Sequence, residues 1–399
     1  MVAAQGLLGK DMVTSSRNQN RMVLSLTEKV VRFFFTRFLT KFISTGCVTI
    51  IEGETMVTFQ GEDLSCHLKS ELEIHSPQFY WKVMTRSDLG LADAYINGDF
   101  SFCNKETGLL NLIMILIANR DLNFSLAKNR GWWNPMFLTT GLAAAKHFYR
   151  QNTLTQARRN ISRHYDLSNE LFALFLDDTM SYSSAVFKSG DEDLRIAQMR
   201  KIYLLIDKAR IKKNHEVLDI GCGWGTLAIE AVRRTGCKYT GITLSVEQLK
   251  YAEAKAKEAG LEFISIPEER YNEYRLNSDF IKEYIFPGGC LPSLARVTSA
   301  MASSSRLCIE HVENIGIHYY QTLRLWRKNF LDRHNQIMDL GFDDKFIRTW
   351  EYYFDYCAAG FKTRTLGDYQ IVFSRPGNVA AFGDDDPFRS SPLTQKKQQ

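Results

Sequence analysis

The segment EVLDIGCGWGTLAIEAVRRTG, residues Glu216–Gly236, decides the fold class of this 399-residue chain. VLDI has the apolar character of a buried strand, and Gly221, Gly223 and Gly225 follow its end in a G-x-G-x-G spacing. The residues after Gly225 have the pattern of a helix. Glycines between a strand and a helix let the backbone turn sharply and approach a ligand closely. The segment therefore predicts an α/β fold with a ligand-binding loop at the end of a buried strand.

An acidic residue precedes these glycines, because Asp219 completes a D-x-G-x-G-x-G pattern. That pattern is the usual loop of S-adenosylmethionine-dependent methyltransferases, whereas a plain glycine turn in another α/β fold is the alternative. The next predicted strand, CKYTGITLS, ends in Thr243, Leu244 and Ser245, where most methyltransferases carry an acid. Ser245 can also cap the helix that follows. We predict an α/β, Rossmann-like S-adenosylmethionine-dependent methyltransferase with a smaller N-terminal α+β domain.

The region before the loop predicts the smaller domain. CVTIIEGETMVTFQGE and CHLKSELEIH alternate apolar and polar residues, as antiparallel strands do. LLNLIMILIA, from Leu109, is an apolar run that predicts a buried helix. After GWWNPMFLTT, helices alternate with strands, which indicates a parallel sheet. The predicted divisions are a flexible N-terminus at 1–20, an α+β lipid-associated domain at 21–125, a linker at 126–157, a methyltransferase domain at 158–376 and a disordered tail at 377–399.

Composition narrows the class of protein. The net charge of +5 suits a surface that meets anions such as phospholipid headgroups, although a merely basic soluble protein fits equally well. The eight cysteines include no CxxC pair, which favours reduced thiols over disulfides or a metal site. The N-terminus has no signal pattern, and no apolar run reaches the ~20 residues of a membrane span. We therefore expect a cytoplasmic protein that associates peripherally with membranes.

A basic amphipathic helix is expected from Ser25, which can serve as its cap. Its apolar residues fall near one face, with basic residues interleaved: Val31, Phe34, Phe35, Phe38 and Phe42, and Lys29, Arg32, Arg37 and Lys41. Such a helix can lie on a membrane surface, or it can pack its phenylalanines on its own domain, which is the commoner case. Apart from 33–42, no cluster of basic and aromatic residues stands out, so nucleic acid is not an expected partner.

Several further segments, in order, carry a resemblance to a known family. These are RRNISRHYDLSNELFALFLDDTMSYSSAVF (Arg158–Phe187), GITLSVEQ, IFPGGCLPS, HYYQTLRLW and YYFDYCAAGFKTRTLGDYQIVFSR. Together they resemble the cyclopropane-fatty-acyl-phospholipid synthases, which include the mycolic acid cyclopropane synthases. LGLADAYINGDF is similar to the N-terminal domain of the phospholipid enzymes. The resemblance runs from about Ser25 to Arg375 and is strongest to the plant members.

The resemblance implies a reaction, a substrate and two small molecules. In this family a cis double bond of an unsaturated phospholipid acyl chain attacks the methyl group of S-adenosylmethionine. A carbocation forms, a proton leaves and a cyclopropane ring closes, with bound bicarbonate taken as the base. Such chemistry requires a dry slot, and aromatic faces can stabilise passing positive charge. Relatives also suggest a homodimer.

The resemblance further implies site residues, position by position. The cofactor-binding positions are Tyr182, Ser183, Gly221, Gly223, Thr243, Leu244 and Gln248. The catalytic positions are Tyr353, which matches the tyrosine of the bicarbonate pocket, Ser184, which stands where many bacterial members carry cysteine, and Cys357, which matches a cysteine once taken as catalytic. An inert buried thiol is the favoured alternative for Cys357, because the sequence shows no nearby base. His164 also matches a family position, and Tyr165, Tyr319 and Trp326 are further aromatic candidates.

One departure from the family lies in AEAKAKEAGLEFISIPEERY, Ala252–Tyr271. A helix ends at Gly260, and LEFISI at once resembles the fifth strand of the methyltransferase sheet. The third and fourth strands, with their adenine-binding turn and a glutamate that helps to hold bicarbonate, are therefore expected to be missing. Two strand–helix units would amount to about sixty residues. LEFISI could instead take the vacant central place in the sheet, and little or no synthase activity is expected either way.

Two other functions remain open from the sequence. Another lipid methyltransferase, acting on sterols or phospholipid headgroups, would share the glycine loop. A non-catalytic lipid-binding or dimerising isoform would keep the N-terminal domain and lose the chemistry.

Overall fold

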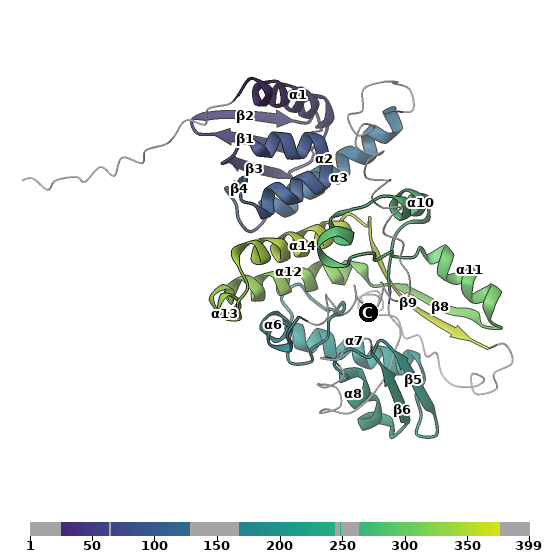
Figure 1. Cartoon of the computed structure of the whole chain (residues 1–399). Coiled ribbons are helices and arrows are strands. Elements are labelled where there is room, and N and C mark those ends of the chain that lie inside the picture. Colours follow the sequence, from purple (N-terminus) through teal and green to yellow (C-terminus); the bar gives the residue numbers. More distant parts are fainter. Residues whose placement is uncertain (1–24, 64, 128–166, 244–247, 249–262, 376–399) are drawn as a thin grey trace, which may run out of the picture.

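The computed structural model describes residues 25–63, 65–127, 167–243, 248 and 263–375. In Figure 1 the N-terminal unit of sheet and helices lies at one end of the molecule. Two long helices from later in the chain lie next to it in space, and the remaining helices and strands lie beyond them. The first unit contains α1 (Leu26–Phe42), β1 (Cys47–Glu52), β2 (Thr55–Gln60), β3 (Lys69–Ile74), α2 (Gln78–Ile96), β4 (Phe100–Phe102) and α3 (Gly108–Ala127). The predicted N-terminus at 1–20, the tail at 377–399 and nearly all of the linker at 126–157 lie outside the described residues.

The second part begins with α6 (Asn169–Phe175), α7 (Leu194–Lys208), β5 (Glu216–Ile220), α8 (Thr226–Thr235) and β6 (Lys238–Ile242). It continues with β7 (Phe263–Ser265), α10 (Glu268–Leu276), the π-helical turn η1 (Ile281–Ile285), α11 (Leu294–Ser304) and β8 (Cys308–Asn314). It ends with α12 (Gly316–Asp332), α13 (His334–Asp339), α14 (Asp344–Lys362) and β9 (Gly367–Ser374). The mixture of helices with parallel and antiparallel strands confirms the α/β class.

Helix α1 begins where its sequence predicts. The Ser25 hydroxyl accepts a hydrogen bond from the Glu28 amide, and the Ser25 amide donates to the Glu28 carboxylate at 2.8 Å. This reciprocal pair is a capping box, which satisfies two amides that the helix itself leaves without partners. The apolar helix predicted from Leu109 is also confirmed, since Leu109, Leu112 and Ile115 are buried along α3.

The N-terminal sheet has the order β2-β1-β3-β4 and corrects one expectation. β1 and β2 form an antiparallel hairpin, but β3 pairs with β1 in parallel. The reason is the path of the chain, which leaves β2, crosses the end of β1 and returns on its other side in the direction of β1. Gly61 lies at this crossing, where a Cβ atom would come within 2.4 Å of the backbone of Ser44. The predicted antiparallel pairing was therefore right for β1 with β2 and for β3 with β4, and wrong for β3 with β1.

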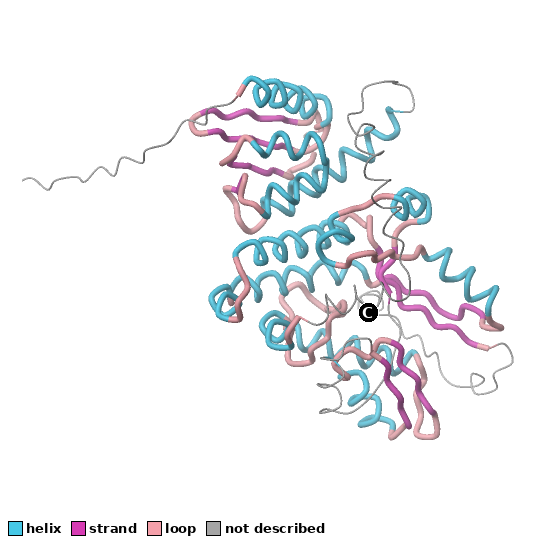
Figure 2. Tube along the Cα trace, viewed as in Figure 1, coloured by secondary structure: helices cyan, strands magenta, loops and turns pink. Residues whose placement is uncertain are grey.

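The strands of the second part form two separate sheets. β5 and β6 pair in parallel as predicted, whereas β9 lies between β7 and β8 and is antiparallel to both. Within the described residues β7 pairs with β9 alone, so the suggestion that LEFISI takes a central place beside β5 was wrong. Figure 2 shows the resulting separation of the strands in this part of the molecule. The parallel sheet predicted from alternating helices and strands is thus present only in β5 and β6.

The core is formed mainly by aromatic residues along α12 and α14. Trp326 and Phe330 on α12 and Phe354 on α14 are fully buried, and Phe175 of α6 packs against all three. None of the helices among the described residues is both long and apolar enough to cross a bilayer.

Candidate active site

The glycine loop follows β5 as predicted and leads into α8. Gly221 and Gly223 have φ angles of +103° and +53°, which residues with a Cβ atom rarely adopt. Among the described residues no atom lies within 4 Å of where a Cβ would stand at either glycine, so they leave open space beside the loop. The Gly221 amide donates to the carbonyl of Ile242 at 2.7 Å, which fixes the loop against the end of β6. This arrangement allows a ligand to approach the backbone closely.

Two contacts hold the loop against the segment that contains Tyr182, Ser183 and Ser184. The indole Nε1 of Trp224 donates to Asn169 Oδ1 at 2.8 Å, and its ring lies 5.0 Å from that of Phe172. The Thr226 hydroxyl, in the first turn of α8, donates to the carbonyl of Thr179. The residues joined by these contacts are 55 and 47 positions apart, so two separate regions of the chain meet at one place.

The tyrosines predicted to bind cofactor and bicarbonate meet directly. The Tyr182 hydroxyl donates to the Tyr353 hydroxyl at 3.0 Å. The ring of Tyr182 lies 5.2 Å from both Phe172 and Trp326, and that of Tyr353 lies 5.6 Å from Trp350. The two hydroxyls thus lie within a nearly continuous group of aromatic rings, a setting that excludes water and favours passing positive charge.

The two serines beside Tyr182 are held in different ways. Ser183 accepts a hydrogen bond from the ammonium of Lys201 at 2.6 Å, and its carbonyl accepts one from Gln198 at 2.9 Å. Ser184 is fully buried, and its hydroxyl donates to the carbonyl of Ala185. The Ala185 amide in turn donates to the Thr322 hydroxyl at 3.0 Å, which fastens the segment to α12.

Cys357 lies one turn after Tyr353 on α14. Burial, and to a lesser extent the nearby Asp279 carboxylate, raise the pKa of the Cys357 thiol well above its ordinary value. A thiol with a raised pKa stays protonated at neutral pH and is a poor nucleophile. The geometry therefore agrees better with the inert thiol than with a catalytic one.

At the end of β6 the Thr243 hydroxyl donates to the amide oxygen of Gln248 at 2.9 Å, so two predicted cofactor positions touch. Asp219, which precedes the glycines on β5, is buried. The predicted positions Leu244, His164 and Tyr165 lie outside the described residues. The ring of Tyr319 stacks on that of Phe361 at 4.6 Å. It also makes a T-shaped contact with Trp326, which belongs to the aromatic group around Tyr182.

Comparison with known proteins assigns this site to a family. The family model described as mycolic acid cyclopropane synthetase matches residues 152–275 and 261–371, which together make up more than half of the chain. The chain belongs to this family. It is thus an S-adenosylmethionine-dependent methyltransferase, as the glycine loop predicts.

Two relatives in this family align with most of the chain. The tuberculostearic acid methyltransferase UfaA1 of Mycobacterium tuberculosis is 32% identical over 368 residues, covering 77% of this chain and 83% of the relative. The cyclopropane-fatty-acyl-phospholipid synthase of Escherichia coli is 28% identical over 357 residues, covering 77% and 88%.

Two solved structures share the fold. The cyclopropane synthase MmaA2 of Mycobacterium tuberculosis superposes with a TM-score of 0.50 at 23% identity, covering 56% of this chain and all of that one. Coclaurine N-methyltransferase gives a TM-score of 0.52 at 18% identity, with 71% and 99% covered. They support the Rossmann-like methyltransferase class.

In this family member, sequence reasoning missed the polar residues that support the site. Gln198 and Lys201 lie three residues apart on the buried face of α7. Two polar residues among the apolar residues of this face were the signal in the sequence that could have identified them. On α14, the buried Asp355 pairs with Arg324 and Arg327 of α12. No local pattern marks this pairing, because its partners come from another helix.

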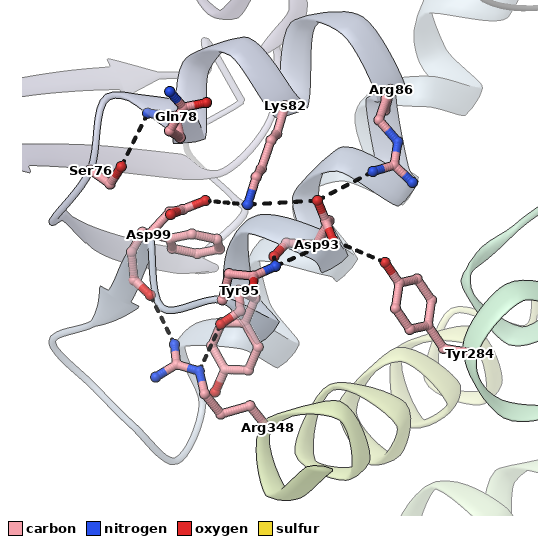
Figure 3. Close-up of polar contacts among 11 residues, drawn as sticks. Ser76, Gln78, Lys82, Arg86, Asp93, Tyr95, Asp99, Tyr284 and Arg348 are labelled. Atoms are coloured by element: carbon pink, nitrogen blue, oxygen red, sulfur yellow. Dashed lines mark hydrogen bonds and ion pairs between the residues drawn. The ribbon is translucent and has the colours of Figure 1, made fainter. Parts of the chain in front are cut away.

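A second polar group that the sequence did not reveal joins α14 to the N-terminal unit (Figure 3). Arg348 donates to the carbonyls of Tyr95 and Phe100 at 2.7 and 3.1 Å, and its guanidinium lies 4.6 Å from the centre of the Tyr95 ring. Tyr284 of η1 donates to Asp93 of α2 at 3.1 Å. The helix that carries Tyr353 is therefore fixed against the first unit.

Proposed function

We propose that this chain is a plant-type member of the family, which transfers the methyl group of S-adenosylmethionine to a cis double bond in an unsaturated phospholipid acyl chain. The bond between sulfur and the methyl carbon would break and release S-adenosylhomocysteine. The methyl carbon would bond to both alkene carbons and give one proton to a base, which closes a cyclopropane ring. The observation that carries the proposal is the Tyr182–Tyr353 hydroxyl pair within its aromatic surroundings, beside the glycine loop. The names of both relatives, a tuberculostearic acid methyltransferase and a cyclopropane-fatty-acyl-phospholipid synthase, support a lipid acyl chain as substrate.

The residues present fit part of an S-adenosylmethionine site. Open space beside Gly221 and Gly223 leaves room for the ligand at the backbone, and Thr243 and Gln248 would contact it at the end of β6. When bound, this cofactor supplies an electrophilic methyl group. The aromatic residues around Tyr182 and Tyr353 would keep water away and would stabilise positive charge on the lipid.

Bicarbonate fits this chain less well. Tyr353 is available as one ligand, but its hydroxyl already accepts a hydrogen bond from Tyr182. The glutamate that the family places after its fourth strand belongs to the region that we propose is missing. We therefore assign no step of the reaction to bicarbonate in this chain.

The same proposal includes a shortened cofactor domain, without the third and fourth strands of the methyltransferase sheet. β5 is apolar like a central strand, yet among the described residues it pairs with β6 alone. Leu218 and Ile220 on β5 are 59% and 61% exposed, and Ile242 on β6 is 48% exposed. These side chains would be covered by the helices and strands of a complete sheet.

The alignments support the same gap. The family model matches in two stretches that overlap at 261–275, as it would if the chain passed directly from one part of the fold to a later one. The alignment with the tuberculostearic acid methyltransferase has 368 positions, but 77% of 399 residues is only about 307. Roughly 60 aligned positions thus have no residue here, which is the length of two strand–helix units.

The test is an activity assay of the purified chain with methyl-labelled S-adenosylmethionine and vesicles of cis-unsaturated phosphatidylcholine. We expect label in cyclopropane acyl chains at a rate far below that of a complete relative. We also expect Gly223→Val to abolish binding of the cofactor, because φ at this position is +53°. Label in a sterol or in the headgroup would contradict the proposed substrate.

Two further results would change the proposal. A rate equal to that of a complete relative would contradict the shortened domain. Vesicle binding without any cofactor binding would instead support the non-catalytic isoform. Peripheral membrane association and a homodimer remain parts of the proposal, and the first is developed below.

A further inference from the structure

Helix α1 divides its apolar residues between two faces. Phe35 and Leu39 are buried, so this face fastens the helix to the N-terminal unit. Phe33 and Phe34, in contrast, are 58% and 48% exposed, and Leu26, Val30 and Phe38 are exposed as well. The expectation that the phenylalanines pack on their own domain is therefore right for one face of α1 and wrong for the other.

The outward face also carries positive charge. Leu26, Val30, Phe33, Arg37 and Lys41 recur at intervals of three or four residues, so they lie along one line of the helix. The apolar part of this line is near the N-terminus of α1 and the cationic part near its C-terminus, and Lys29 is exposed at its side.

Little negative charge opposes this face. The only acidic residue of α1 is Glu28, which is engaged in the capping box with Ser25. Arg32, on the other side of the helix, forms an ion pair with Glu52 of β1. The outward face of α1 thus combines exposed aromatic rings with cations that form no ion pair with a described carboxylate.

The gap in the cofactor domain does not explain this exposure. Leu218 and Ile220 are exposed at strands that lack their neighbours, but α1 belongs to the unit whose four strands form one sheet. Figure 1 shows α1 on the outer side of that sheet, away from α12 and α14. None of the described elements covers its exposed face.

We infer that the outward face of α1, formed by Leu26, Val30, Phe33, Phe34, Phe38, Lys29, Arg37 and Lys41, docks the protein onto an anionic phospholipid surface. Aromatic side chains enter the boundary between headgroups and acyl chains, while lysine and arginine contact the phosphates. This inference rests on the proposed action on phospholipids, because it names the surface that would bring the chain to its substrate. Since α1 lies away from α14, which carries Tyr353, it anchors the molecule and does not deliver the acyl chain.

The test measures sedimentation of the full chain with vesicles of saturated phosphatidylcholine, with and without saturated phosphatidylglycerol. Saturated lipid contains no double bond, so binding is measured apart from any reaction. We expect salt-sensitive binding to the anionic vesicles only. Phe33→Ser with Phe34→Ser, and separately Arg37→Glu with Lys41→Glu, should each weaken it at least tenfold with unchanged circular dichroism.

Matched controls use exposed residues elsewhere in the chain. Arg306→Glu with Lys345→Glu changes the net charge equally, and Leu340→Ser removes an apolar side chain that is 42% exposed. Both should bind as the natural chain does. Unchanged binding of the α1 variants would overturn the inference. So would loss of self-association in those variants without loss of vesicle binding, since that result would assign the face to a second copy of the chain.

The reaction is tested separately with unsaturated lipid dispersed in detergent, where no membrane surface is required. Product labelled in a sterol or a headgroup there, or no binding of S-adenosylmethionine, with vesicle binding intact, would contradict the proposed function and leave the docking surface standing. If vesicle binding does not depend on α1 but product forms in detergent, the docking surface is contradicted and the proposed function stands.

Discussion

The two halves of the molecule differ in whether the apolar side chains of their strands are buried or exposed. In the N-terminal sheet, β3 alternates between exposed and buried residues, and its buried side chains Leu72 and Ile74 face the core. In β5 the most apolar side chains, Leu218 and Ile220, face solvent, while the carboxylate of Asp219 is buried. A strand with both faces apolar is typical of the interior of a parallel sheet. The sequence of β5 is therefore suited to neighbours that the described residues do not provide.

The helical part of the methyltransferase half has no such mismatch. α12, α14 and α6 bury their aromatic residues, and the Tyr182–Tyr353 pair forms between them. These elements lie in sequence on both sides of the proposed gap. The proposed gap would therefore remove part of the sheet and leave the aromatic part of the site assembled, so that a family site could be recognisable without being complete.

The largest expected effect comes from restoring the missing region. Inserting the two strand–helix units of a complete relative between Gly260 and Phe263 should raise the rate of cyclopropane formation at least ~100-fold. Removing a single well-placed electrostatic group from an active site already costs about that much. The measurement is the labelled-lipid assay described above.

The control for this insertion is a Gly/Ser segment of equal length, which should restore nothing. If the natural chain already matches the restored one, β5 does not need its missing neighbours and the comparison between the two halves fails.

A pair of matched substitutions tests the same comparison by stability. Ile50→Lys, on the buried face of β1, should lower the free energy of unfolding by about 3–5 kcal/mol, because it removes a core side chain and buries a charge. Ile220→Lys, on β5, should change it by no more than about 0.5 kcal/mol, as is usual for exposed positions. Urea denaturation of both variants measures the difference. An equally large loss at Ile220 would mean that β5 is covered in solution.

Local sequence predicted the elements whose causes are local. The Ser25 cap, the glycine loop and the apolar α3 each depend on residues within a few positions of one another. The direction of β3 could not be predicted in this way, because β3 pairs with β1 and the deciding contact is the crossing at Gly61.

The candidate site shows the same limit. Tyr182 and Tyr353 were named through the family resemblance, since nothing local relates residues 171 positions apart. Lys201 beside Ser183, and Asp355 between two arginines of α12, depend on how the helices pack and were missed. The proposed absence of two strands came from the same resemblance, because the order of strands in the family's sheet can be compared with the chain element by element.

The smallest expected effect is the coupling free energy between the hydroxyls of Tyr182 and Tyr353, which a double-mutant cycle measures. Tyr182→Phe and Tyr353→Phe keep both rings and remove the hydrogen bond of 3.0 Å between them. We expect each single variant to lower the free energy of unfolding, and the pair to show a coupling of about 0.5–1.5 kcal/mol. Tyr182→Phe combined with Tyr80→Phe is the control, since Tyr80 bonds to Glu52 in the N-terminal unit, and these changes should add within about 0.5 kcal/mol. Equal coupling in both pairs would mean that the two hydroxyls do not meet in solution. The aromatic part of the site would then be as incomplete as the sheet, and the contrast between the two would be lost.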